Sequence, residues 1–373
     1  MSTRIYTMTH KQFDPPADPV YIPLHVGRLG KADMGYQGDD TGEHISDLNC
    51  YYGELTGLYW IWQNLDYDGN IGVCHYRRYF MNERRELLTE AEYDAILSDH
   101  DVMTSQAIYI DKPYREYYAE AHNGTDLILE GEVIRELFPE DYPVFEQVMA
   151  GNKYYFGNLM VTSRANFDAY CQWLFQIFAE LGNRIDVSTY DEYHRRVFGF
   201  LSEQLLMVWI QARGLKVYEG QIKITDEKAE TREFKLAIAQ LVKNGKISEA
   251  RQLFYEILKV RPDIRLEHSD ILREIPLIEQ ILYICECEKQ QNRDGMLDYS
   301  NDLFTLLTHV KKVLQFLLQP EEWTKEECEY LKETKVSEIA VEVLAKNHAG
   351  LSSGWKQCLE RYRRQIGTGR ETS

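Results

Sequence analysis

The chain has 373 residues, of which 44% are hydrophobic and 27% are charged, and its formal net charge at pH 7 is −18. This composition is typical of a folded protein with one large domain or two ordinary ones, and it excludes an intrinsically disordered chain. The negative charge excludes general binding to nucleic acid, because attraction to phosphate dominates that affinity, but it allows a local basic pocket.

The first part of the chain alternates short apolar runs with helical periodicity. The run "IYTM" is followed by polar residues, as are "YIPLHV" and "NIGVC". Between the second and third runs lies a glycine-rich segment over residues 27–49, which we expect to be a long loop. The expected elements are strands over residues 4–8, 21–26, 70–74 and 100–105, and helices over residues 51–65 and 90–97.

The next part continues this alternation up to about residue 226. Residues 111–150 look irregular to helical, and "YYFGNLMVTS" predicts another strand. Ser163 is expected to cap a long helix that stops at Gly182. A further helix ends at Gly214, and "LKVYEG" predicts a last strand. The pattern indicates an α/β fold with a mostly parallel sheet flanked by helices.

Strand signals stop after this point. The segment "LAIAQLVKNGKISEARQLFYEILKVRPDI" resembles one helical hairpin of the tetratricopeptide type, although no second copy follows it. An irregular helical bundle is the alternative. We therefore expect two domains, 1–226 (α/β) and 227–373 (all-α). The helical domain is expected to dock on the first one or on a protein partner and not to bind a donor substrate.

The cysteines and the N-terminal sequence indicate the cellular compartment of the protein. The seven cysteines have no framework spacing, and C-x-C at Cys285 and Cys287 alone is not a zinc site. The first residues lack the apolar core of a signal peptide, and no run approaches eighteen apolar residues. We expect a cytoplasmic protein with reduced thiols, and a peripheral contact with the inner face of a membrane stays open.

Cationic and donor-rich side chains follow the strand "NIGVC". They are His75, Arg77 and Arg78. The arginine fork suits phosphate oxygens, and histidine can donate to phosphate or to a sugar hydroxyl. If the chain stays extended, His75 and Arg77 share one face and Arg78 turns toward structural carboxylates. The alternative is that both arginines simply pair with carboxylates of this acidic protein.

Two further strand ends carry histidines. His10 and Lys11 follow the first strand, and His25 ends the second. Each residue alone is better explained as a polar side chain whose hydrogen bonds are made within the protein. Three strand ends of this kind at one edge of the sheet, however, predict a substrate-binding site. Asn158, in "YYFGN", is a further candidate for substrate binding.

The helix "GFLSEQLL" places Glu203 in apolar surroundings. Burial raises the pKa of a carboxyl group, so Glu203 is a candidate general base or anchor for an acceptor hydroxyl, and His75 is the second catalytic candidate. A solvated helix glutamate is the alternative. The charged loop "YDEYHRR" just upstream, which ends at Arg196, is expected to reach the ligand.

Several common signatures are absent from the sequence. There is no G-x-x-x-x-G-K-[ST], no G-x-G-x-x-G after a strand, no G-x-S-x-G and no H-E-x-x-H. There is also no D-x-D after an apolar strand, which is the usual metal-holding motif of nucleotide-sugar transferases. The sequence therefore predicts no metal-ligating residues.

Three blocks of the sequence resemble the DUF4422 glycosyltransferase-like family. They are "DDTGEHISDLNCYYGELTGLYWIWQNL", "IGVCHYRRYF" and "GFLSEQLLMVWI". Members of this family occur in bacterial capsule and exopolysaccharide loci, and some are galactosyl- or galactofuranosyltransferases. The typical "SERL" of the family appears here as Ser202-Glu203-Gln204-Leu205, so Gln204 stands in place of an arginine.

The resemblance implies a GT-A-like fold and a reaction. We expect a glycosyltransferase that moves a hexose, galactose in pyranose or furanose form, from a UDP-sugar to a growing polysaccharide or lipid-linked glycan. The H-Y-R-R cluster stands about where such enzymes present D-x-D, so cationic side chains would replace the metal and make a divalent ion dispensable. The rivals are a non-catalytic nucleotide-sugar or glycan-binding module and a metal-requiring sugar-phosphate transferase.

Overall fold

The computed structural model describes residues 2–265 and 269–367. The chain divides into two compact units, Met1–Thr225 and Asp226–Ser373, here called the N-terminal and the C-terminal unit. All seven cysteines are free thiols. In the described part of the chain, no helix combines the length and the apolar character needed to cross a membrane.

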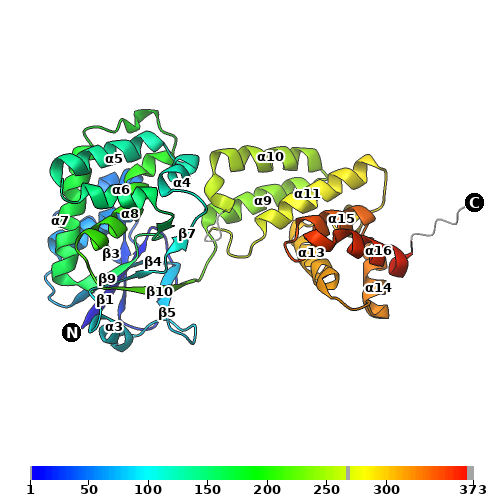
Figure 1. The fold of residues 1–373 in the computed structure, drawn as a ribbon, viewed down its shortest axis with the longest axis horizontal. Helices are drawn as coiled ribbons and strands as arrows, with labels where there is room; N and C mark the ends of the chain where they lie inside the picture. Colours follow the sequence, from blue (N-terminus) through cyan, green and yellow to red (C-terminus); the bar gives the residue numbers. More distant parts are fainter. Residues whose placement is uncertain (1, 266–268, 368–373) are drawn as a thin grey trace, which may run out of the picture. The chain divides into compact units, whose positions relative to one another are not determined.

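The N-terminal unit holds an eight-stranded sheet, a two-stranded ribbon and the helices around them (Figure 1). The strands of the sheet are β1 (Thr3–Thr9), β2 (Tyr21–His25), β3 (Gln37–Gly38), β4 (Asn70–His75), β5 (Arg78–Met81), β6 (Val102–Ser105), β9 (Met160–Ser163) and β10 (Val217–Ile224), and the ribbon pairs β7 (Ile108–Tyr109) with β8 (Lys153–Tyr154). The helices are α1 (Asn49–Tyr52), α2 (Leu55–Asn64), α3 (Glu90–Leu97), α4 (Tyr114–Ala121), α5 (Gly124–Leu137), α6 (Tyr142–Ala150), α7 (Arg164–Leu181) and α8 (Val197–Ala212), with 3-10 turns at Ser46–Leu48, Val187–Thr189 and His194–Arg196.

The sheet is mixed, and the prediction of a mostly parallel sheet is corrected in this respect. The pairs β1–β2, β1–β4, β2–β3 and β6–β10 are parallel, whereas β4–β5, β4–β9, β6–β9 and β5–β10 are antiparallel. A tight turn after β4 reverses the chain into β5, and a parallel partner would need a long crossover. Strand β4 pairs with β9, β9 with β6, β6 with β10, β10 with β5, and β5 again with β4. These five strands therefore close a ring.

Both faces of the sheet are covered. Along β1, Tyr6 belongs to the core shared with α2 and α4 to α8, whereas its neighbour Ile5 belongs to a second core shared with Tyr93 of α3. This is the period-two alternation of a strand buried on both sides. Figure 1 shows α3 on the opposite side of the sheet from α5, α6 and α8.

Two expected elements are interrupted at left-handed residues. The helix predicted over residues 51–65 breaks into α1 and α2 at Gly53, whose φ is +56°. The strand predicted over residues 154–163 is regular only from Met160, because Gly157 and Asn158 have φ values of +84° and +53°. Such φ values cannot continue a helix or a strand. Both breaks lie beside the candidate site.

The long helix predicted after Ser163 is confirmed. Helix α7 begins at Arg164, and the Ser163 hydroxyl accepts a hydrogen bond from the backbone N–H of Asn166 at 3.3 Å. Its apolar face includes Phe167, Leu174 and Phe178, all fully buried. Cap and apolar stripe together specify this helix locally.

The described residues of the C-terminal unit form helices joined by turns and loops, and none of these residues forms a strand. Its helices are α9 (Ala229–Lys243), α10 (Ile247–Val260), α11 (Ile275–Gln290), α12 (Met296–Tyr299), α13 (Leu303–Leu318), α14 (Lys325–Glu333), α15 (Glu338–Asn347) and α16 (Trp355–Ile366), with 3-10 turns at Pro262–Arg265 and Ser352–Gly354. Helices α9 and α10 form a hairpin that turns at Gly245, whose φ is +70°. The unit has its own apolar core, which includes Phe234, Phe254 and Ile281.

Candidate active site

Three neighbouring strands end at the same edge of the sheet. In the parallel register of β1, Thr9 pairs with His25 of β2, and Met8 pairs with His75 of β4. The strand ends that carry His10, His25 and His75 therefore lie side by side. This convergence was inferred from sheet topology and is confirmed by the register.

The H-Y-R-R segment is a hairpin turn and does not stay extended. Strand β4 ends at His75, the chain turns at Tyr76 and Arg77, and β5 begins at Arg78, which pairs with His75 across the hairpin. The expectation that His75 and Arg77 share a face is therefore corrected, because period-two alternation does not hold through a turn. Arg77 is 3% exposed, and its carbonyl accepts a hydrogen bond from Thr225 N–H at 3.0 Å.

Positive charge gathers around His75. Its Nδ1 is buried, and no hydrogen-bond partner for it lies in the described residues. Burial lowers the pKa of His75 well below its ordinary value, and the charges of Arg78, Arg77, His10 and Arg196 lower it further. Each of these neighbouring charges is cationic, so His75 is a neutral imidazole in a locally positive site.

Arg78 belongs to this cluster. Its guanidinium carbon lies 4.1 Å from the centroid of the Phe156 ring, and its Nε is buried without a hydrogen-bond partner among the described residues. Burial and the charge of Arg77 lower the pKa of Arg78 to about 10, whereas Glu203 and Glu54 favour its charged form. Arg78 is thus a cation at neutral pH whose buried Nε–H donor has no acceptor among the described residues.

Two glutamates from distant parts of the sequence complete the cluster. Glu54 lies between α1 and α2, and Glu203 lies on α8. Asn158 joins the elements, because its Nδ2 donates to Glu54 Oε1 at 3.0 Å and to Ser202 Oγ at 2.8 Å. The Asn158 Oδ1 is buried without a hydrogen-bond partner among the described residues.

Burial, and to a smaller extent the neighbouring charge of Glu54, raise the pKa of Glu203 to about 8. Arg78, Arg196 and a hydrogen bond from the Gly157 backbone oppose this rise without cancelling it. The direction is the one expected for a carboxyl in an apolar helix. Glu203 therefore holds its proton to a higher pH than an ordinary glutamate does.

This shift predicts a pH dependence of stability. Between the ordinary value of 4.5 and about 8, the folded state holds a proton on Glu203 that the unfolded chain has lost. The free energy of unfolding should thus fall as pH rises through this window, by up to about 1.4 kcal/mol per pH unit. Urea unfolding of wild type and Glu203→Gln at pH 5, 6.5 and 8 measures it. The variant should lose less stability than wild type, and parallel curves would contradict a protonated Glu203.

The remaining predicted residues fall into two environments. The imidazole of His10 lies 5.6 Å from the Tyr76 ring, and the Lys11 ammonium lies 4.8 Å from the same ring, so both stand at the cationic cluster. His25 is 1% exposed with both ring nitrogens unpartnered among the described residues. The strongest charges on His25 are those of Lys31, Asp39, Arg28 and Asp40, whereas the strongest on His75 are those of Arg78, Arg77, His10 and Arg196.

Asp39 anchors the loop that leads to Glu54. This buried carboxylate accepts hydrogen bonds from the backbone N–H groups of Gly27 and Arg28 at 2.7 and 3.1 Å. It also accepts from the hydroxyls of Ser46 and Thr56 at 2.5 and 2.7 Å. Thr56 lies in the first turn of α2, so Asp39 fixes the start of the helix that Glu54 precedes.

Sequence reasoning missed Glu54, and it named Arg196 only as the end of a charged loop. A guanidinium nitrogen of Arg196 lies 4.0 Å from Glu54 Oε2. The one local signal for Glu54 was the preceding Gly53, a residue type that often marks a special backbone turn. Across residues 2–265 and 269–367, no three His, Cys, Asp or Glu side chains are grouped so that they could hold a metal ion.

The family entitled "Domain of unknown function (DUF4422)" matches residues 4–214. The chain belongs to the DUF4422 family. No curated protein matches the chain in sequence. Among solved structures, the apo form of the WbbM bifunctional glycosyltransferase is similar, with a TM-score of 0.57 and 26% identity. The match covers 61% of this chain and 46% of that chain, so this DUF4422 protein matches less than half of the length of WbbM. The likeness supports a glycosyltransferase-like function.

Proposed function

We propose that this protein is a glycosyltransferase that moves a hexose, galactose in pyranose or furanose form, from a UDP-sugar to a growing polysaccharide or lipid-linked glycan. The observation that carries the proposal is the cationic cluster at the edge of the sheet, in a chain similar to a known glycosyltransferase. The whole protein has a net charge of −18, yet the charges that act most strongly on His75, those of Arg78, Arg77, His10 and Arg196, are positive.

Such a cluster suits the leaving group of the reaction. When the bond between sugar and UDP breaks, negative charge develops on the β-phosphate and must be stabilised. Arg78 would donate to the diphosphate through its unpartnered Nε, and neutral His75 would donate or accept through its buried Nδ1.

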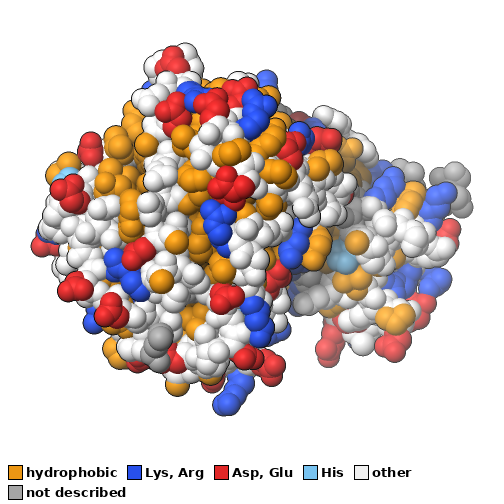
Figure 2. All heavy atoms as spheres, turned by 60° about the vertical axis from the view of Figure 1, so that its left-hand side comes forward, with side chains coloured by type: hydrophobic (Ala, Val, Ile, Leu, Met, Phe, Trp, Pro, Cys, Tyr) orange, Lys and Arg blue, Asp and Glu red, His pale blue; other side chains and the backbone are white. Residues whose placement is uncertain are grey.

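Figure 2 shows acidic and basic side chains scattered over the face of the N-terminal unit turned to the viewer.

The experiment that tests this function measures which nucleotide is released. The full chain is incubated with UDP-galactose or UDP-galactofuranose and a panel of octyl glycosides as acceptors. Glycosyl transfer releases UDP and extends the acceptor. Release of UMP would instead show sugar-phosphate transfer, and binding of the donor without any product would show a non-catalytic binding module.

Transfer should continue when divalent ions are removed. The reason is that Arg78 and its cationic neighbours would neutralise the diphosphate in place of a bound metal. Turnover in excess EDTA is compared with turnover in added Mn²⁺ or Mg²⁺, and we expect the rates to agree within about threefold, well short of the several kcal/mol that a metal contributes. Complete loss in EDTA with recovery on adding metal would overturn the cationic mechanism and leave the transferase function standing.

A further inference from the structure

The two carboxylate oxygens of Glu54 are in different environments. Oε1 accepts the hydrogen bond from Asn158 at 3.0 Å. Oε2 lies 4.0 Å from the Arg196 guanidinium, which is too far for a hydrogen bond, and the side chain of Glu54 is 20% exposed. One oxygen is therefore fixed, while the other can meet a hydroxyl that arrives from solvent.

The backbone and a hydrogen-bond chain set the position of Glu54. Gly53, with φ of +56°, turns the chain immediately before it, and α2 begins immediately after it. Asn158 is itself held by Ser202, whose hydroxyl donates to the Gly199 carbonyl at 2.8 Å. A general base needs this kind of fixed geometry, because it must stay within hydrogen-bond reach of the proton it removes.

Glu203 is less suited to that role, although it lies in the same cluster. It accepts a hydrogen bond from the Gly157 backbone, and burial raises its pKa and so favours its protonated form. A protonated carboxyl can donate a hydrogen bond to a ligand but cannot take a proton from one. The charge of Arg78 acts on both glutamates, so the two carboxyl groups and the cation belong to one site.

We propose that Glu54 is the general base of the transfer reaction and that its Oε2 receives the proton of the acceptor hydroxyl. This inference rests on the proposed function. The acceptor oxygen forms a bond to the anomeric carbon while the bond between that carbon and the β-phosphate oxygen breaks. The electron pair leaves with UDP beside Arg78, and the proton of the acceptor hydroxyl passes to Oε2 of Glu54.

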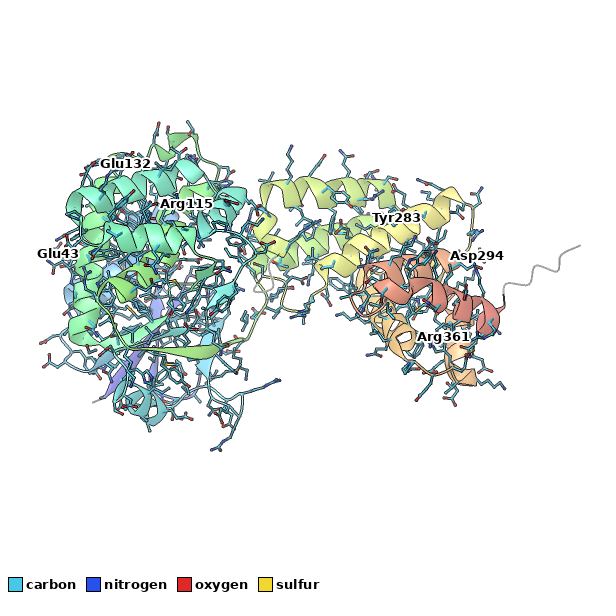
Figure 3. The ribbon with its side chains drawn as sticks, in the orientation of Figure 1. Glu43, Arg115, Glu132, Tyr283, Asp294 and Arg361 are labelled. Atoms are coloured by element: carbon cyan, nitrogen blue, oxygen red, sulfur yellow. The ribbon has the colours of Figure 1, made fainter. Side chains whose placement is uncertain are left out.

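The first test compares two isosteric variants in the full-length protein. With UDP-galactose and an octyl galactoside, Glu54→Gln should lower kcat by about 10²–10⁴-fold. Its affinity for UDP should stay within about threefold of wild type, because the amide keeps the shape of the side chain and the base acts only on the acceptor. Glu203→Gln should retain at least tenfold more turnover than Glu54→Gln, since an amide replaces a protonated carboxyl without loss of charge. Glu43→Gln, an exposed residue of the same unit that is labelled in Figure 3, should match wild type.

The second test separates a base from a structural residue. Added formate should restore turnover of Glu54→Ala by at least tenfold, because a small carboxylate can enter the space left by the side chain and accept the proton. Formate should not restore Glu203→Ala. A purely structural role for Glu54 predicts no rescue by formate, whatever the loss of activity.

The outcomes distinguish this inference from the proposed function. If wild type transfers galactose and Glu203→Gln is the more impaired variant, with formate rescue only at position 203, then Glu203 is the base. A stable glycosyl adduct on Glu54 would make it a nucleophile and would also overturn the inference. If wild type releases no UDP from any donor, the proposed function fails and the base assignment falls with it.

Discussion

Replacing Arg78 with alanine should weaken UDP binding by about one to two orders of magnitude and slow transfer by at least as much. A hydrogen bond to a charged group contributes about 1.5–3 kcal/mol, and each 1.4 kcal/mol corresponds to a tenfold change. Arg78 has a buried Nε without a partner among the described residues, so its loss removes a donor that no protein group already uses. Calorimetric titration with UDP and steady-state kinetics measure the two effects.

Two matched variants sharpen this prediction. Arg78→Lys keeps the charge but loses the planar fork, so it should recover only part of the affinity. Arg184→Ala removes an arginine of the same unit that pairs with Glu136 and Glu180, and it should leave UDP binding unchanged. Should Arg77→Ala weaken UDP binding while Arg78→Ala does not, then Arg77 and not Arg78 faces the diphosphate.

Replacing Asp39 with alanine should destabilise the N-terminal unit by about 3–5 kcal/mol. The substitution removes the acceptor of four hydrogen bonds, and a buried donor left without a partner costs about 1–3 kcal/mol. The total cost is smaller than four such penalties, because a donor that water reaches in the variant is no longer without a partner. Urea unfolding followed by tryptophan fluorescence reports mainly on this unit, because Trp60, Trp62, Trp173 and Trp209 lie in it.

The neighbouring residue provides the control for Asp39. The Asp40 carboxylate meets one guanidinium nitrogen of Arg28, at 3.5 Å, and its side chain is 20% exposed. Asp40→Ala should change the free energy of unfolding by no more than about 0.5 kcal/mol, as for most partly exposed ion pairs. Equal effects at both positions would show that Asp39 does not hold the loop in the way that its four contacts indicate.

The elements that the sequence predicted well are those that local rules specify. Helix α7 has a serine cap and a continuous apolar stripe, and helix α3 lies over the residues that its periodicity indicated. The strand ends that carry His10, His25 and His75 were also predictable, because apolar runs that end in polar residues mark the edge of a sheet. These signals involve residues within a few positions of one another, so a single sequence contains them in full.

Pairing and burial were decided only by the tertiary structure. The sequence does not show that the chain reverses at Tyr76 and Arg77, because nothing local says that β5 will pair with β10, more than a hundred residues away. For the same reason the sequence does not show that the sheet is mixed and not mostly parallel. The hairpin pairs His75 with Arg78, whereas an extended chain would have placed His75 on the same face as Arg77.

The sequence by itself determined which residue types stand at the strand ends, the apolar face of each main helix, and the family to which the chain belongs. The tertiary structure decided which of these residues form a site. Glu54, Arg78, Asn158 and Glu203 come from four separate elements, and Asn158 reaches Glu54 only because both lie next to left-handed backbone turns. Side-chain periodicity is a local property, whereas the desolvation that raises the pKa of Glu203 depends on everything packed around it.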